Sequence, residues 1–178
     1  MPAHVSRRAA LASAALATAT VLACAAAAQP ALGLAERRAV AAYQEGVFPG
    51  LLAKIRAAAG TDVEVDVGWD RIAQPGQAAQ YAGPGYWTDI YFTPLIRFTP
   101  LIRALTAVGS DAMGRDALKA KLRRIAVAYN PDTAPASNYP NGLRFADGTL
   151  TINWHPNSNA ADVADRAEAL QKVLEAGL

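Results

Sequence analysis

The residues best suited to chemistry are two aspartates and a tryptophan close together in the sequence. Asp66, Trp69 and Asp70 end the stretch "VEVDVGWD", whose alternation is typical of a strand. An indole flanked by carboxylates suits a sugar or cell-wall fragment, and two carboxylates at the proper separation can share glycoside hydrolysis. A structural role also fits, with Asp70 capping a short turn and Trp69 filling the core, and we favour that role.

The same two interpretations apply to three further residues, Trp87, Tyr91 and Trp154. Aromatic residues in strands more often belong to the core than to a ligand platform. Beyond the first 28 residues His155 is the only histidine, which excludes a zinc site built from several imidazoles. His155 with Asp66, Asp70 or Asp89 could still bind a harder cation or form an acid–base pair. The simpler interpretation is a strand-end residue before Pro156.

The sequence motifs of common enzyme classes are absent. There is no G-x-S-x-G, no P-loop, and the single cysteine is Cys24. Arg115 and Asp116 follow Gly114 at an expected helix start, where they could hold an anion, although a capped turn is the favoured interpretation. Basic residues alternating with apolar ones after this point indicate a solvated helix face. We expect no cofactor, no metal and no nucleic-acid partner.

The first 28 residues are typical of an export signal. Arg7 and Arg8 precede an uncharged, Ala-rich run, and Ala26 and Ala28 are the small residues that a signal peptidase requires. The predicted chain after cleavage starts at Gln29 and has no integral membrane span. The leader holds two of the 17 Lys and Arg, so 15 remain against 15 Asp and Glu. We therefore expect a neutral periplasmic or secreted protein.

Two variants of this export signal stay open. Ser6-Arg7-Arg8 with a weakly hydrophobic core resembles a twin-arginine signal, as an alternative to the general secretory route. Val21-Leu22-Ala23-Cys24 resembles a lipoprotein box, in which case Cys24 would anchor the protein to lipid.

Periodicity and turn residues predict the elements of residues 29–178. We expect a helix over 34–59 in two segments, because Gly46, Pro49 and Gly50 interrupt it, and a C-terminal cap at Gly60. Strands are predicted within 61–69, at 86–92 and within 123–130, with a loop over 71–85 and a longer one over 130–142. Asp147-Gly148 predicts a tight hairpin turn within 143–154.

Three helices are predicted in the second half of the chain. The hexapeptide Phe-Thr-Pro-Leu-Ile-Arg occurs twice, at 92–97 and 98–103, and we expect the packed helix to begin at Pro100 while the first copy bulges out as a loop or turn. The next helix has Ser110 and Asp116 as candidate caps. Asn159 is the expected cap of the last helix, with an apolar stripe through Val163, Ala167, Leu170 and Leu174, and with Asp165, Arg166, Glu168 and Lys172 facing water.

These elements predict one α+β domain over residues 29–178. We expect a single, mainly antiparallel sheet of about four to five strands, covered by helices on one face as a two-layer sandwich. About 150 residues are enough for one hydrophobic core without disulfides.

Four stretches of this chain resemble a group of small exported proteins of Gram-negative bacteria that has no established activity. They are "VEVDVGWD", "GRDALKAKLRRIAV", "GTLTINW" and "RAEALQKVLEAGL". The resemblance spans most of the chain after the leader and rests on packing and capping motifs. It implies no functional residue, and Gly68 and the doubled hexapeptide depart from the group's pattern.

Two functions remain as hypotheses. The first is a non-enzymatic binding or interaction module of the cell envelope, such as an inhibitor or immunity factor, whose partner is another envelope protein or a cell-wall fragment. The alternative is a small envelope hydrolase using Asp66, Asp70 or His155.

Overall fold

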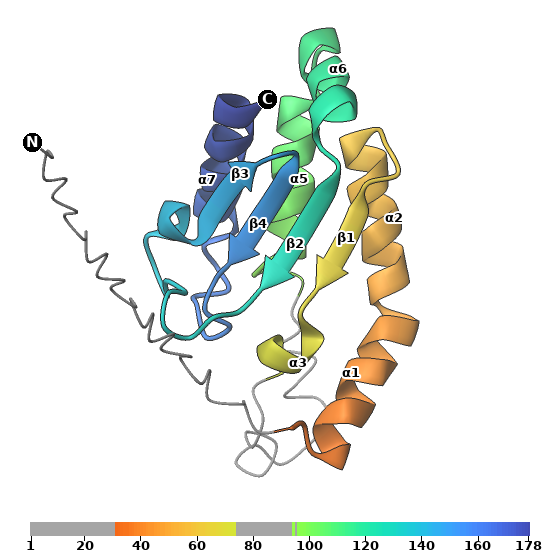
Figure 1. The fold of residues 1–178 in the computed structure, drawn as a ribbon, viewed down its shortest axis with the longest axis vertical. Coiled ribbons are helices and arrows are strands. Elements are labelled where there is room, and N and C mark those ends of the chain that lie inside the picture. Colours follow the sequence, from red (N-terminus) through yellow and green to blue (C-terminus); the bar gives the residue numbers. More distant parts are fainter. Residues whose placement is uncertain (1–30, 74–93, 95) are drawn as a thin grey trace, which may run out of the picture.

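The computed structural model describes residues 31–73, 94 and 96–178. In this part of the chain, six α-helices accompany one four-stranded sheet. Figure 1 shows the sheet in front, with α2, α5 and α7 behind it. The expected strand over 86–92, with Trp87 and Tyr91, lies outside the described residues.

The first two helices form as predicted. α1 (Leu34–Gly46) and α2 (Phe48–Ala59) are separated at Val47, and Gly60 ends α2 with a left-handed φ of 66°. Pro49 lies in the first turn of α2, where a missing backbone donor costs no helical hydrogen bond. Tyr43 and Ile55 are among the buried residues that hold these helices against the core.

The sheet is mixed, so the prediction of a mainly antiparallel sheet is wrong. Its strands are β1 (Glu64–Val67), β2 (Arg124–Ala128), β3 (Leu143–Ala146) and β4 (Thr149–Asn153), in the order β1-β2-β4-β3. β2 is parallel to both β1 and β4, and β3 pairs antiparallel with β4. The helices between β1 and β2 return the chain to the end of the sheet where β1 begins, which makes that pair parallel.

The predicted hairpin between β3 and β4 is confirmed. Asp147 and Gly148 have φ values of 51° and 75°, which is the pair of positive angles that a tight primed turn requires. A Cβ at position 148 would lie 2.7 Å from the carbonyl oxygen of Lys121, so glycine is also required sterically.

Alternate strand residues form the core under the helices. Ile125, Val127, Leu150 and Ile152 are buried from the sheet, and the facing helices contribute Leu101, Leu105, Leu170 and Leu174. Val67 of β1 is buried as well, whereas the remaining strand residues, among them Asp66, Arg124 and Thr151, are at least partly exposed. The core therefore lies between the sheet and α2, α5 and α7 (Figure 1).

The helix α5 (Phe98–Val108) begins two residues before the predicted Pro100. Phe98 is buried and packs against Phe48 with ring centroids 5.6 Å apart. This contact favours a helix that already begins at Phe98, with Pro100 in its first turn. The described end of the first hexapeptide forms a turn, as one of the two alternatives predicted, but it does not bulge out. Ile96 and Arg97 are buried there, so the expectation of an exposed insertion is wrong.

Two helix caps differ from the prediction by a few residues. α6 (Ala112–Lys121) is capped by Asp111, whose carboxylate accepts from the Gly114 amide at 2.7 Å, and neither Ser110 nor Asp116 has this role. α7 (Val163–Gly177) follows Asp162 instead of Asn159. The Asn159 side chain supports the preceding turn, because it accepts from the Ala161 amide at 3.1 Å and donates to Asp162 at 2.6 Å.

A short helix and a 3₁₀ turn complete the described fold. α3 (Trp69–Ile72) begins one residue after β1 and joins the end of the predicted strand region 61–69 to the start of the predicted loop 71–85. The 3₁₀ turn η2 (Tyr139–Gly142) leads into β3. Among the described residues, no helix combines the length and apolar character needed to cross a membrane.

Candidate functional site

The sequence-predicted residues around Trp69 have separate neighbours in the structure. Trp69 is half-buried and packs against Tyr43 at 5.7 Å and edge-on against Phe48 at 5.0 Å, as ring-centroid distances. Asp70 is exposed in the first turn of α3 and does not cap it, because Gly68 occupies that position. Asp70 lines a hollow of about 420 Å³ together with Gln44 and other residues of α1 and the β1 end.

Asp66 belongs to a surface ion-pair group on the sheet. The guanidinium of Arg124 on β2 donates to the Asp66 carboxylate, and its Nε lies 3.6 Å from the Glu64 carboxylate. Alternation along β1 points Asp66 away from buried Val67, toward the face that α2, α5 and α7 leave uncovered. Asp66 and Asp70 therefore have different neighbours, and none of the contacts described for them is shared.

His155 follows β4 and is held by its own turn. Its ring lies perpendicular to that of Tyr129, with centroids 5.4 Å apart. Burial, and next the positive charge of Arg97, lower the pKa of the imidazole. Nδ1 accepts from the Asn157 amide at 3.1 Å, which only a neutral imidazole can do. These contacts favour the simpler prediction of a structural strand-end residue.

Trp154 is an internal anchor. It is fully buried, its Nε1 donates to the Tyr139 carbonyl at 2.9 Å, and its ring meets that of Tyr139 at 70°. No ligand can stack on a ring enclosed in this way. Trp87 and Tyr91, the two remaining candidates, lie outside the described residues.

Two buried arginines were not recognised in the sequence. Arg97 is 2% exposed and donates from Nη2 to the Trp154 carbonyl at 2.9 Å. Arg166, expected to face water, is 0% exposed and donates to the Asn159 carbonyl at 2.8 Å and to the Tyr139 hydroxyl at 3.2 Å. Burial lowers the pKa of both, that of Arg97 to about 10, and both remain charged at neutral pH.

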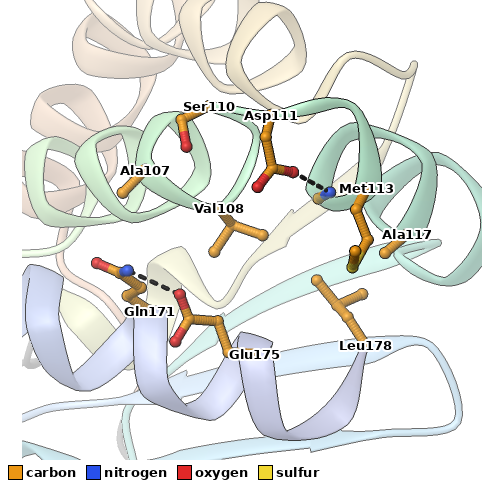
Figure 2. A pocket seen from close by; sticks show the side chains of 10 residues that line it. Ala107, Val108, Ser110, Asp111, Met113, Ala117, Gln171, Glu175 and Leu178 are labelled. Atoms are coloured by element: carbon orange, nitrogen blue, oxygen red, sulfur yellow. Dashed lines mark hydrogen bonds between the residues drawn. The ribbon is translucent and has the colours of Figure 1, made fainter.

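A groove that the sequence did not reveal combines an exposed apolar side chain with a concave surface. It lies between the ends of α5 and α7 and the start of α6, with a volume of about 390 Å³ (Figure 2). Ten residues line it: Ala107, Val108, Ser110, Asp111, Met113, Gly114, Ala117, Gln171, Glu175 and Leu178. We call these residues the α5–α6–α7 groove.

Apolar side chains from all three helices meet in the α5–α6–α7 groove. Figure 2 shows Val108 at its centre and Met113 and Leu178 directed toward one another at one side. Met113 is 80% exposed, the largest exposed fraction among the large apolar residues of the described chain. An unbranched thioether side chain adapts to irregular partners, which makes it suitable for a binding surface.

Glycine at position 114 sets the geometry of the groove. A Cβ there would lie 1.7 Å from the carbonyl oxygen of Val108, so only glycine lets the start of α6 approach the end of α5 this closely. Asp111 caps α6 from the rim, and Gln171 donates to Glu175 at 2.7 Å across one turn of α7. The sequence shows only that Met113 precedes Gly114, and neither the exposure of Met113 nor the close approach at Gly114 could be inferred from that pair.

The polar groups that line the α5–α6–α7 groove are the carboxylates of Asp111 and Glu175, the Ser110 hydroxyl and the Gln171 amide. Arg115, for which an anion site was the less favoured interpretation, donates from its guanidinium to the Gly109 and Ser110 carbonyls at 3.2 Å each. No cluster of three or more His, Cys, Asp or Glu within residues 31–73, 94 and 96–178 could hold a metal ion.

Comparison with other proteins adds no identification. No protein-family model, curated protein or solved structure matches this chain. The resemblance to small exported proteins of Gram-negative bacteria remains a sequence-based expectation.

Proposed function

We propose that this chain is a non-enzymatic interaction module of the cell envelope that binds another envelope protein through the α5–α6–α7 groove. The observation that carries the proposal is Met113, an 80% exposed apolar side chain beside a groove with an apolar centre. Water-exposed apolar side chains beside a concave surface are typical of sites that receive a partner's side chain.

The proposal includes the location and layout expected from the sequence. The chain acts in the periplasm or outside the cell after removal of residues 1–28, or stays anchored to lipid through Cys24. Its single domain is a two-layer sandwich, and the groove lies where the last turns of two covering helices meet a third. A groove made by rigid helices holds its shape before binding, which reduces the entropy lost on association.

The alternative, a small hydrolase using Asp66, Asp70 or His155, has less support. Catalysis would require these groups to face one scissile bond. Asp66 instead pairs with Arg124, Asp70 lies beside α1, and His155 is fixed between Tyr129 and its own turn. A cell-wall fragment cannot stack on the indole of Trp154, because that ring is fully buried.

The test compares two apolar-to-acidic variants. The chain is expressed from its first residue, purified in the form that the producing cell leaves, and used to capture proteins from envelope extract. Met113→Asp alters the groove, and Leu34→Asp is the matched control, because Leu34 is also exposed, at 56%, but lies at the start of α1. Captured proteins are identified by mass spectrometry, and the Kd of each purified partner is measured.

We expect one stoichiometric partner whose Kd rises about tenfold or more for Met113→Asp and is unchanged for Leu34→Asp, as for a central contact residue. Equal binding by both variants would place the interface elsewhere. Hydrolysis of cell-wall glycan that disappears in Asp66→Asn or Asp70→Asn would replace the proposal with the hydrolase alternative.

A further inference from the structure

We infer that the α5–α6–α7 groove selects an apolar side chain flanked by positive charge, such as a leucine beside a lysine or arginine of the partner. This inference rests on the proposed function and specifies the partner that the groove accepts. It follows from the charges at the rim of the groove, from the helix ends that meet there and from its size.

The charged side chains that line the groove are all acidic. Asp111 and Glu175 contribute carboxylates, and none of the ten lining residues is basic. Both carboxylates belong to exposed residues and surround an apolar centre (Figure 2). A partner's cation next to an inserted apolar side chain would reach these carboxylates without being buried itself, so it would keep most of its hydration.

The helix ends add to this negative potential. α5 ends at Val108 and α7 ends at Gly177, so the carbonyl ends of two helices lie at the groove. The C-terminal end of a helix carries partial negative charge and attracts cations. The opposite, positive end of α6 also starts there, but the Asp111 carboxylate already satisfies its Gly114 amide.

Neighbouring basic residues cancel this potential only in part. Arg115 donates to the carbonyls of Gly109 and Ser110 and so neutralises the end of α5. On α7, Lys172 precedes Glu175 by about one turn, but its ammonium group is paired with the Glu168 carboxylate at 2.6 Å. Arg103 lies one turn before Ala107 on α5 and is not part of the lining. Glu175, hydrogen-bonded to neutral Gln171, keeps its negative charge available to a partner.

The size of the groove favours one side chain over a whole helix. A volume of about 390 Å³ is near the lower limit for ligand pockets, which span about 300–1,000 Å³. A single leucine side chain can enter this space while the charged groups of its neighbours remain at the rim. Met113 can change rotamer to close over the inserted group.

The test uses three blocked tripeptides in which a central leucine is flanked by two lysines, two glutamines or two glutamates. Each is titrated to about 10 mM into the isotope-labelled chain, and amide shifts are followed by NMR, in the concentration range of weak single-residue contacts. We expect the amides of Val108, Gly114 and Glu175 to shift. The lysine peptide should bind about two- to fivefold more tightly than the glutamine peptide, the range of an exposed ion pair.

A charge-neutral variant isolates the electrostatic contribution. Asp111→Asn with Glu175→Gln removes both carboxylates, while Asn still caps α6 and Gln still accepts from Gln171. In this variant the preference for the lysine peptide over the glutamine peptide should shrink to the part that the helix ends contribute, and leucine binding should persist. For the unmodified chain, raising the salt concentration should likewise reduce the preference for the lysine peptide over the glutamine peptide.

The outcomes separate this inference from the proposed function. If no peptide shifts the groove amides up to 10 mM, the groove is not a binding site and both proposals fail. If all three peptides bind equally, the groove binds apolar groups and only the charge selection fails. If the same amides shift with protein concentration alone, a second copy of the chain occupies the groove, and this too overturns the inference.

Discussion

The guanidinium carbon of Arg166 lies 4.3 Å from the centroid of the Tyr139 ring, and the hydroxyl of the same tyrosine accepts a hydrogen bond from Arg166. That hydroxyl donates in turn to Asp162 at 2.6 Å. One tyrosine thus joins a buried cation on α7 to the carboxylate at the helix start. The ring contact and both hydrogen bonds link η2 to α7 next to the enclosed Trp154.

Replacing Arg166 should destabilise the fold strongly. Arg166→Lys keeps the charge but loses the planar contact with Tyr139 and one of two hydrogen-bond partners, so we expect a loss of about 2 kcal/mol in the free energy of unfolding. Arg103→Lys, at an exposed position of α5, should change it by less than about 0.5 kcal/mol. Denaturant unfolding measures both. Equal effects would show that the buried contact contributes nothing.

Removing the Tyr139 hydroxyl should cost less than replacing Arg166. Tyr139→Phe keeps the ring under the guanidinium but loses the hydroxyl's bonds to Arg166 and Asp162, which predicts a loss of about 1–2 kcal/mol. If the Arg166→Lys and Tyr139→Phe effects are additive in a double-mutant cycle, the two residues do not act as one network.

His155 should make stability fall in mild acid. Its pKa is lower in the folded chain than the ordinary 6.5, because burial and then Arg97 disfavour the imidazolium. Between the two pKa values the unfolded chain binds more protons, so the free energy of unfolding decreases as the pH falls below 6.5. We expect a larger loss between pH 7.5 and pH 5 for the original chain than for His155→Gln. Parallel pH profiles would contradict the assignment.

Alanine substitutions at two glycines should have opposite effects. Gly114→Ala places a Cβ 1.7 Å from the Val108 carbonyl oxygen, which forces α6 away from α5 and should cost about 2 kcal/mol or more. Gly50→Ala, inside α2, meets no atom within 4 Å and should stabilise by about 0.4–1 kcal/mol. Thermal unfolding of both variants checks the signs. A stable Gly114→Ala protein would show that the helices can separate at little cost.

Neutralising Asp66 should have a small effect. Its ion pair with Arg124 is exposed, and exposed pairs contribute about 0–1 kcal/mol. Asp66→Asn should therefore lower the unfolding free energy by less than about 1 kcal/mol, and high salt should reduce the difference further. A larger loss of unfolding free energy that does not depend on salt would indicate that the Asp66 carboxylate is shielded from water.

Elements with local signals could be predicted from the sequence. Asp147-Gly148 specifies its turn by the positive φ angles that these residues tolerate, and Gly60 ends α2 for the same reason. The alternation of Val65 and Val67 identifies β1. The alternation of buried and exposed side chains is the same in parallel and antiparallel strands, however. It therefore could not predict that β2 pairs parallel with both β1 and β4.

The candidate site depends on contacts that no local pattern contains. The α5–α6–α7 groove joins residues of 107–117 to residues of 171–178, and only the packing of α7 on α5 brings them together. Arg166 was expected to face water with the other polar residues of the last helix, but its aromatic and carbonyl partners come from η2 and the loop before α7. The separate neighbours of Asp66 and Asp70 are likewise set by the fold.

The parallel pairing of β1 with β2 also has a kinetic consequence. Glu64 is opposite Arg124, so closing this ladder requires two segments about 60 residues apart to meet, whereas β3 and β4 meet across a two-residue turn. Non-local pairing slows folding, and the hairpin can form first and offer β4 to β2. We expect β1 to join last, so a chain crossing a membrane unfolded would keep the apolar edge of β2 exposed until residues 64–67 arrive. A chain in which β1 has not yet paired would present an unpaired strand edge, which favours aggregation and chaperone binding.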